Sequence, residues 1–223
     1  MPDDSPSLFN VPSQIALPLG AQTLHPPQRL VVGNGNSSVI EALSDPASWP
    51  FHVAVLTGPA RSGKSLIGRW LAGQERSLAL EVIDDAHRVD EVELFHRWNA
   101  VQQGGARAGE ALLLIAGQGE SGWQIALPDL ASRIGGSLQL AITEPDDAMA
   151  GDLLMALAEQ RGLSLPQAAA DYLVPRMERS YAALEALVAA IDRISLERQS
   201  PATMSVWRAA LEALQGPEQQ RLF

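Results

Sequence analysis

Short apolar runs bounded by turn-forming residues recur through the first two thirds of the chain. Runs this short are typical of strands that are buried on both faces of a parallel sheet. Helical patterns at about 64–72 and 89–103 separate them, and this alternation predicts an α/β fold with a parallel sheet. The buried strands are expected at His52–Thr57, Leu78–Ile83, Ala111–Ala116 and Leu138–Ile142, after a further strand at Arg29–Val32 and a short helix near Val39–Leu43.

Beyond Thr143 the pattern becomes entirely helical. Thr143 is expected to cap the first helix and Gly162 to end it. Ser164 and Gln167 have the spacing of a capping box for a second helix. A third helix carries an apolar stripe at every third or fourth position, and Ser200–Pro201 is expected to begin a fourth. These signals predict a small all-α domain behind the α/β core.

The chain is expected to have four parts. Residues 1–27 are rich in proline and carry no convincing helix or strand, so we expect a flexible arm there. Residues 28–143 form the α/β core, residues 144–215 the helical domain, and residues 216–223 a polar tail. A length of 223 residues has room for one moderate domain and a smaller second one.

Composition and charge narrow the classes of function. Hydrophobic residues make up 46% of the chain and charged residues 19%, which excludes broad disorder. The net charge of −10 opposes direct binding to the phosphate backbone of DNA. The absence of cysteine excludes disulfides, thiolate zinc sites and thiol nucleophiles. Neither a signal peptide nor a membrane-spanning run is recognisable, so a cytoplasmic location is expected.

A phosphate-binding loop is the strongest chemical signal. The segment GPARSGKS (Gly58–Ser65) fits G-x-x-x-x-G-K-[ST], with a predicted strand before it and a predicted helix after it. In such a loop, backbone amides converge on phosphate oxygens, Lys64 neutralises the β- and γ-phosphates, and Ser65 ligates Mg²⁺. The alternative, a plain glycine-rich turn, does not require this context. The residues expected to bind ADP or ATP are Gly58, Pro59, Ala60, Arg61, Ser62, Gly63, Lys64, Ser65 and Leu66.

An acidic pair follows the next predicted strand. Asp84 is placed to hold the magnesium ion through its water shell, and Asp85 to orient or polarise an attacking water. The alternative is that one of the two aspartates caps the following helix, and both interpretations can hold together. His87 lies near the pair, where a capping or surface role is expected.

The order of these parts resembles the AAA+ family, in the branch that contains DnaA and Hda, from about Leu30 to Leu214. The most specific segment is LPDLASRIGG (Leu127–Gly136), which is similar to the family's box VII. The arginine of that box reaches into the nucleotide site of a neighbouring subunit. The resemblance therefore implies that Arg133 is an arginine finger, which stabilises charge on a transferred phosphoryl group. The alternative is a surface arginine.

Three departures from the family pattern are visible. Only about 20 residues separate the lysine of the phosphate loop from the acidic pair, so the core is expected to be trimmed to four parallel strands where five are usual. The sensor I position falls near Gly117 and Gln118. The usual sensor II arginine aligns with Ala182, with Arg179 one turn earlier as a possible substitute. These departures imply weak or no ATP hydrolysis by the chain itself.

Two short peptides resemble motifs that bind the replication sliding clamp. QIALPL (Gln14–Leu19) is similar to the hexapeptide of Hda, and QQRLF (Gln219–Phe223) to a five-residue form of the motif. Such extended peptides place a glutamine at a polar site and apolar side chains in a pocket, and two of them add avidity. The alternative for the tail is a chance sequence or packing on the helical domain. The residues expected to contact the clamp are Gln14, Leu17, Pro18, Leu19, Gln219, Leu222 and Phe223.

The resemblance implies a clamp-bound regulator that presents Arg133 to ATP on DnaA. Hydrolysis there would convert the initiator to its ADP form and prevent repeated initiation. One alternative is an autonomous ATPase that uses Asp85, and another is a non-catalytic adaptor tethered to the clamp. Sequence-specific DNA binding is not expected, because the chain stops after the helical domain and is acidic. Membrane binding is not expected either, because no apolar run is long enough to span a bilayer. Head-to-tail self-association and the choice between ADP and ATP stay open.

Overall fold

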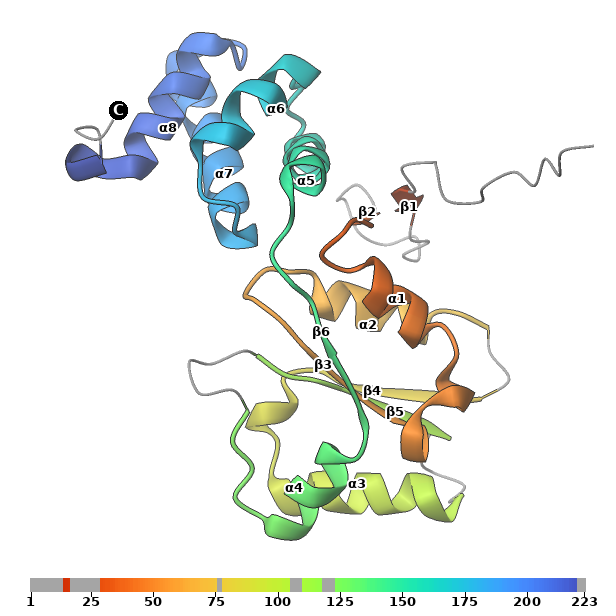
Figure 1. Ribbon diagram of the computed structural model, residues 1–223. Coiled ribbons are helices and arrows are strands. Elements are labelled where there is room, and N and C mark those ends of the chain that lie inside the picture. Colours follow the sequence, from red (N-terminus) through yellow and green to blue (C-terminus); the bar gives the residue numbers. More distant parts are fainter. Residues whose placement is uncertain (1–13, 17–28, 76–77, 105–109, 118–122, 220–223) are drawn as a thin grey trace, which may run out of the picture.

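The computed structural model describes residues 14–16, 29–75, 78–104, 110–117 and 123–219, and the side chains among them except at 14–16 and 215–219. An α/β core lies below a helical domain, and an extended segment after the last core strand joins them (Figure 1). The core sheet has four parallel strands in the order β4-β5-β3-β6. These strands are β3 (Val53–Thr57), β4 (Leu80–Ile83), β5 (Ala111–Ile115) and β6 (Leu138–Ala141). The predicted trimmed α/β core is confirmed.

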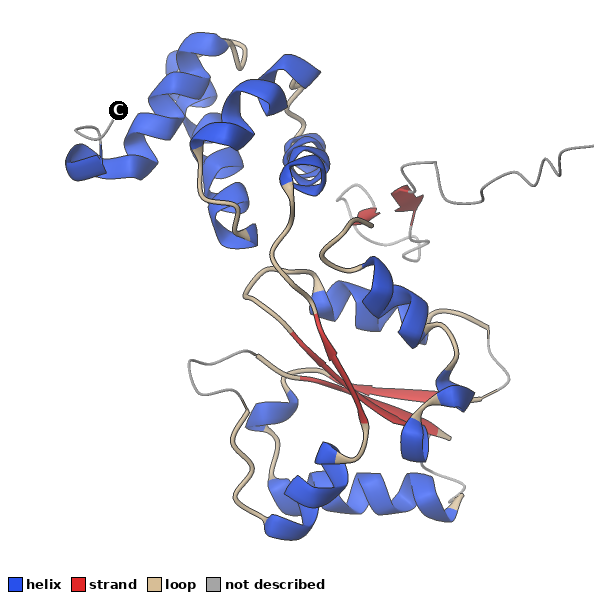
Figure 2. Cartoon of the chain, viewed as in Figure 1, coloured by secondary structure: helices blue, strands red, loops and turns tan. Residues whose placement is uncertain are grey.

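Helices cover both faces of the sheet (Figures 1 and 2). The helices α1 (Ser37–Leu43) and α2 (Lys64–Ala72) pack on one face, and α3 (Glu91–Gln103) and α4 (Pro128–Gly135) on the other. Alternate residues of β3 and β5 therefore enter one apolar cluster or the other. Burial on both faces explains why these strands are apolar throughout rather than alternating with polar residues.

Two short strands lie outside the core sheet. The strand β2 (Arg29–Val31) pairs antiparallel with β1 (Gln14–Ala16). The arm expected at residues 1–27 therefore contains a strand, because backbone pairing with β2 orders three residues that have no side-chain signal of their own. The bounds of that arm, as of the other three parts, stay a prediction.

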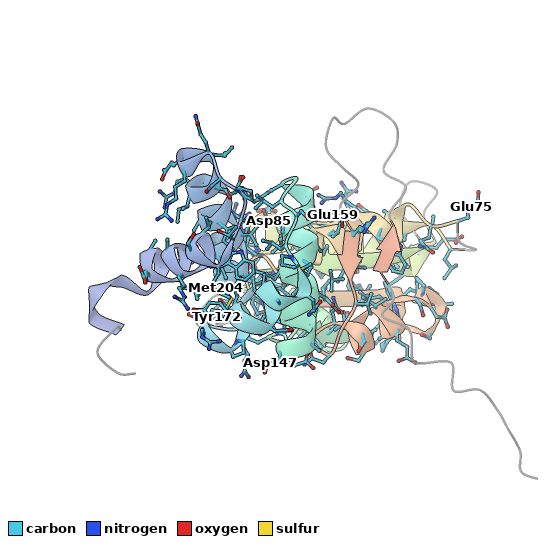
Figure 3. The ribbon with its side chains drawn as sticks, turned by 90° about the horizontal axis from the view of Figure 1, so that it is seen from above. Glu75, Asp85, Asp147, Glu159, Tyr172 and Met204 are labelled. Atoms are coloured by element: carbon cyan, nitrogen blue, oxygen red, sulfur yellow. The ribbon has the colours of Figure 1, made fainter. Side chains whose placement is uncertain are left out.

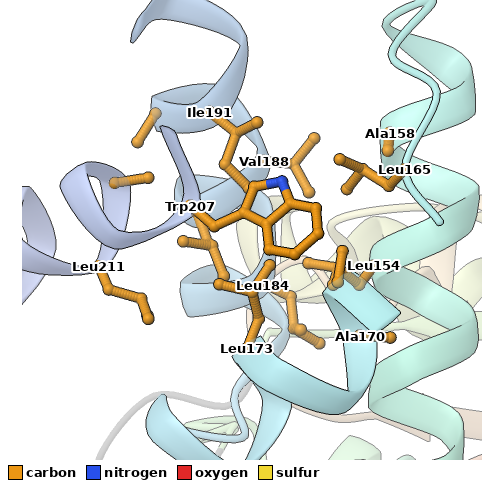
Figure 4. Packing of buried hydrophobic residues seen from close by; sticks show 14 of the residues in the cluster. Leu154, Ala158, Leu165, Ala170, Leu173, Leu184, Val188, Ile191, Trp207 and Leu211 are labelled. Carbon is orange, nitrogen blue, oxygen red and sulfur yellow. The ribbon is translucent and has the colours of Figure 1, made fainter. Parts of the chain in front are cut away.

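The helical domain consists of four α-helices with a shared apolar core (Figure 4). They are α5 (Asp147–Gln160), α6 (Gln167–Leu173), α7 (Tyr181–Arg198) and α8 (Met204–Gln219). The indole ring of Trp207 inserts between α5, α6 and α7, and residues with little or no exposure, such as Leu154 and Leu184, surround it. The stripe predicted on the third helix supplies the α7 side of this core.

Several predicted helix ends were wrong. Asp146, not Thr143, caps α5, and its carboxylate accepts a hydrogen bond from the amide of Met149 at 2.8 Å. Thr143 is unavailable because its amide donates to Gly35 and its carbonyl accepts from Tyr181, which holds the joining segment extended. Gly162, with φ of 71°, ends α5 as predicted.

The two later helix starts also differ from prediction. The capping box of Ser164 and Gln167 does not form, since α6 begins after Pro166 without a side-chain cap. The helix α8 begins at Met204 rather than at Ser200–Pro201, because the carbonyl of Ser200 is bonded to the hydroxyl of Ser195. It then continues through Gln219, into the segment predicted as a polar tail. Within the described residues, no helix is both long and apolar enough to cross a membrane.

Candidate nucleotide-binding site

The phosphate loop joins the end of β3 to the start of α2, as its motif requires. Gly63 directly precedes α2 with φ of 83°, and a Cβ atom there would meet nothing, so the backbone conformation alone favours glycine. Gly58 has φ of 154°, and a Cβ atom there would lie 2.9 Å from the side chain of Ile142. The two glycines therefore allow the tight turn and the close approach to the segment after β6.

Polar groups in the loop are arranged to meet an anion. The amine of Lys64 donates to the carbonyls of Gly58 and Pro59, at 2.9 Å and 2.6 Å. The hydroxyl of Ser62 is buried, and the described residues offer it no hydrogen-bond partner. A buried donor without an acceptor is uncommon unless another molecule satisfies it. Because phosphate oxygens are acceptors for both groups, the loop fits the nucleotide that its motif predicts.

Burial lowers the pKa of Lys64, while the negative charges of Asp84 and Asp85 act in the opposite direction. The acidic pair is therefore close enough to influence this amine electrostatically. Lys64 is also the single lysine of the chain; the other basic side chains, apart from histidine, are arginines. Phosphate binding would add negative charge beside the amine and raise its pKa.

A cavity of about 370 Å³ opens beside the loop. The loop and α2 form one side, and β2 with residues of α5 and α7 from the helical domain forms the other. Its apolar lining suits the base and sugar of a nucleotide. The residues that form this apolar wall are Leu30, Val31, Met149, Leu153, Ala156, Leu157 and Tyr181. Sequence analysis missed them, because they come from separate elements and none belongs to a local motif.

Asn36 was also missed, although it stands in a recognisable turn. Its side chain is buried, accepts from the amide of Gly33 at 2.9 Å and donates to the carbonyl of Val31 at 2.8 Å. These two bonds fix the turn between β2 and α1 at the cavity wall. The signal was the sequence GNGNSS, in which asparagine alternates with glycine.

Arg61, within the loop, connects the core to the helical domain. Its φ of 65° is left-handed, which costs a residue other than glycine about 1 kcal/mol or more. Its guanidinium contacts the carboxylate of Glu185 on α7, with Nε to Oε2 and Nη1 to Oε1 both at 3.3 Å. Both side chains line the cavity.

The acidic pair follows β4 at the expected edge of the sheet but does not line the cavity. Asp84 accepts from the amide of Asp85 at 3.0 Å, and Asp85 lies 3.7 Å from Arg88. Asp85 stands at the N-cap position of the short 3-10 helix that follows (Ala86–Arg88), as the capping interpretation expected, but its side chain makes no capping bond there. The cap of α3 is Asp90. Asp90 lies at the start of the helix itself, which is why its carboxylate reaches the first free amides.

Magnesium binding by Ser65 and Asp84 stays a prediction. Among the described residues, no group of three or more histidines and acidic side chains could hold a metal ion. A single carboxylate with a hydroxyl is consistent with an ion that takes its other ligands from phosphates and water.

Arg133 lies apart from the cavity. It is in the last turn of α4, on the sheet face opposite α2 (Figure 1). Its guanidinium lies over the rings of Phe95 and Trp98, 4.6 Å and 4.7 Å from their centres, and donates to the amide oxygen of Asn99. The structure therefore does not bring Arg133 together with the chain's own phosphate loop.

The residues at the predicted sensor positions make contacts away from the cavity or lie outside the described residues. The amide of Gly117 donates to Nδ1 of His87 at 3.3 Å, while Gln118 lies outside the described residues. Arg179 pairs with Asp147 at 2.7 Å and does not line the cavity. In the view from above, Asp147 lies at the edge of the molecule (Figure 3). Ala182 carries no polar side chain. The basic side chain that contacts α7 at the cavity is that of Arg61, through Glu185.

The clamp-peptide predictions are largely untested by the structure. Gln14 is the first residue of β1, and Gln219 is the last residue of α8. The other residues expected to contact the clamp, Leu17, Pro18, Leu19, Leu222 and Phe223, lie outside the described residues.

Tyr181 gives the stability of the joining segment a pH dependence. Burial, helped by the charge of Glu144, raises its pKa to about 12, and its hydroxyl donates to Thr143. From about pH 10 to 12 the folded state keeps a proton that the unfolded state loses, so stability falls as pH rises. We expect the wild type to lose about 2 kcal/mol more over this interval than Tyr181→Phe, by urea unfolding. Parallel profiles for the two proteins would contradict this.

Comparison with known proteins finds similarities for both the helical domain and the α/β core. Residues 147–211 match the family model described as Hda, lid domain. Domain III of the replication initiation protein DnaA from Thermotoga maritima superposes with a TM-score of 0.67 at 16% identity, over 84% of this chain and 95% of that one. The Holliday junction branch migration motor RuvB of Thermotoga maritima gives 0.56 at 15% identity, over 74% of this chain and 63% of that one. The chain thus carries a segment similar to the Hda lid domain behind a core with the fold of DnaA domain III and RuvB.

Proposed function

We propose that this protein regulates replication initiation by stimulating hydrolysis of the ATP bound to DnaA, through Arg133 acting in trans. The observation that carries the proposal is the match of residues 147–211 to the Hda lid, behind a core whose fold is that of DnaA domain III. The segment that resembles box VII adds the candidate arginine.

The nucleotide of this chain has a structural role in the proposal. Lys64, Ser62 and the amides of the phosphate loop would hold the phosphates, and Ser65 with Asp84 would hold Mg²⁺. When bound, ADP or ATP supplies concentrated negative charge at the contact between core and lid. Ala182 places no basic side chain at the sensor II position, so we expect the chain to hold its nucleotide rather than to hydrolyse it efficiently. Asp85, which is exposed and lies 3.7 Å from Arg88, would orient an attacking water if the chain hydrolyses its own ATP.

The position of Arg133 favours action on another molecule. Its guanidinium lies on the opposite sheet face from α2, the helix that follows the phosphate loop, where Arg133 and Phe95 are half-buried and Trp98 is buried. To meet a phosphoryl group of DnaA, the side chain must leave these rings and the oxygen of Asn99. The exchange replaces contacts worth about 1 kcal/mol each with a charge-assisted bond to phosphate.

Clamp binding completes the proposal. Gln14, Leu17, Pro18 and Leu19 would occupy one pocket of the ring, and Gln219, Leu222 and Phe223 a second. The extended backbone of Gln14–Ala16 is compatible with a peptide that binds as a strand. The acidic chain would thus reach DNA through the clamp rather than by its own charge. A head-to-tail contact between two copies would use the same Arg133 surface.

The test is a reconstitution with ATP-bound DnaA and sliding clamp loaded on DNA. We expect phosphate release to rise when the full chain is added, and to rise less when Gln14→Ala and Leu17→Ala are combined. Removal of residues 219–223 separately measures the second peptide. If DnaA hydrolyses ATP at the same rate with and without the protein and clamp, the proposed function is wrong.

A further inference from the structure

A strained arginine in the phosphate loop holds a glutamate of the lid across the nucleotide cavity. Arg61 has φ of 65°, and both of its contacts with Glu185 measure 3.3 Å. We propose that Arg61 exchanges Glu185 for a phosphate oxygen when a nucleoside diphosphate or triphosphate binds, which releases α7 from the loop. This inference rests on nucleotide binding at the proposed site but not on the stimulation of DnaA.

The backbone at Arg61 is the first observation behind this inference. Left-handed φ values suit glycine, which the chain uses at Gly58 and Gly63 on either side. A side chain at such a position is retained only where the surroundings fix it, and these outliers cluster at ligand-binding sites. In the described structure, what the side chain of Arg61 reaches is Glu185.

The second observation is the charge around the cavity. Glu185 places a carboxylate among the residues that line a site built for an anion, a lining that also includes Lys64 and Ser62. A bound polyphosphate repels this carboxylate and competes with it for the guanidinium, since it carries more negative charge. The side chain of Arg61 is 67% exposed, so it has room to change partners.

The third observation is that α7 has no arginine of its own at the cavity. Ala182 lies one turn before Glu185, and Arg179 is paired with Asp147. Arg29 and Arg69 also line the cavity; Arg29 is paired with Glu159 on α5, and Arg69 lies on α2. Among the described residues, the ion pair of Arg61 with Glu185 thus joins the phosphate loop to α7 through a contact that an anion can break.

Nucleotide affinity tests the exchange directly. ADP and ATP are titrated by calorimetry into the full chain and into Arg61→Gly, Glu185→Gln and the double variant. We expect Glu185→Gln to bind nucleotide about 3- to 10-fold more tightly and Arg61→Gly about 10-fold more weakly. Glycine accepts the left-handed backbone, so Arg61→Gly is expected to fold. In the Arg61→Gly background, Glu185→Gln should give a smaller gain, because no guanidinium remains to be released.

Glu197→Gln is the matched control. Glu197 is on the same helix, is paired with Arg193 at 3.1 Å, and lies outside the cavity. The nucleotide affinity of Glu197→Gln should therefore equal that of the wild type. A gain for ATP alone assigns the contact to the γ-phosphate, and a gain for both nucleotides to an inner phosphate; either supports the exchange. Unchanged or weaker binding by Glu185→Gln, or equal gains in both backgrounds, overturns it. If the wild type binds neither nucleotide, the proposed site itself fails, which is a distinct result.

Discussion

Replacing Arg133 with alanine is expected to abolish the stimulated hydrolysis of ATP on DnaA, a loss of about 1,000-fold or more in the stimulated rate constant. The physical reason is that an arginine finger adds its charge where negative charge develops on the transferred phosphoryl group. Phosphate release from ATP-bound DnaA with loaded clamp is the measurement. Arg133→Lys should restore little, since an ammonium group lacks the planar fork of a guanidinium.

Controls must separate this loss from a loss of fold. The cation–π contacts of Arg133 with Phe95 and Trp98 are worth about 1 kcal/mol each, so the alanine variant is expected to stay folded. Its melting temperature and nucleotide affinity check this. Arg97→Ala is the matched variant, because Arg97 is on neighbouring α3 but pairs with Glu81 at 2.6 Å. Full stimulation by Arg133→Ala would show that the arginine finger is elsewhere.

The resting place of Arg133 also bears on the partner. A guanidinium that lies over two aromatic rings is shielded from solvent on the side of the rings, so it is less available to phosphates in solution. A partner must supply enough contact to draw it from Phe95 and Trp98. We expect the partner's surface to cover these rings, as specific recognition of DnaA requires.

The phosphate loop and the buried strands could be predicted because their signals are local. A strand such as Ala111–Ile115 is apolar throughout, and the loop motif fixes both glycines and the helix start. The trimmed sheet followed from counting the residues between the loop and Asp84. The helix α4 was not predicted as a helix at all, because its eight residues stand out by their likeness to box VII rather than by periodicity.

The rest depended on contacts between distant parts of the chain. Thr143 has the side chain of a helix cap, yet a backbone bond to Gly35 and a hydrogen bond from the Tyr181 hydroxyl hold it extended. The cavity wall combines β2, α5 and α7, and no local pattern joins them. Arg61 was predicted only as one position of the loop. Its left-handed backbone and its contact with Glu185 exist only in three dimensions.

Replacing Lys64 with alanine is expected to weaken ADP and ATP binding about 100-fold. An ammonium group that leaves two backbone carbonyls for phosphate oxygens makes charge-assisted bonds, and removing about 3 kcal/mol of such interaction changes Kd by about two orders of magnitude. Calorimetry measures the loss. Arg193→Ala removes one positive charge from the outer side of α7 and should bind as the wild type does.

Chemical modification gives the same residue a second, independent readout. Since Lys64 is the single lysine, an amine-reactive acylating reagent has one side-chain target in the chain besides the terminal amine. Its lowered pKa leaves more neutral amine at a given pH, which favours reaction. Saturating ADP or ATP should slow acylation of Lys64, measured by mass spectrometry of the peptide that contains it, because phosphate occupies the amine and restores its proton. Equal acylation with and without nucleotide, together with unchanged affinity of Lys64→Ala, would remove Lys64 from the site and leave the phosphate loop as a turn.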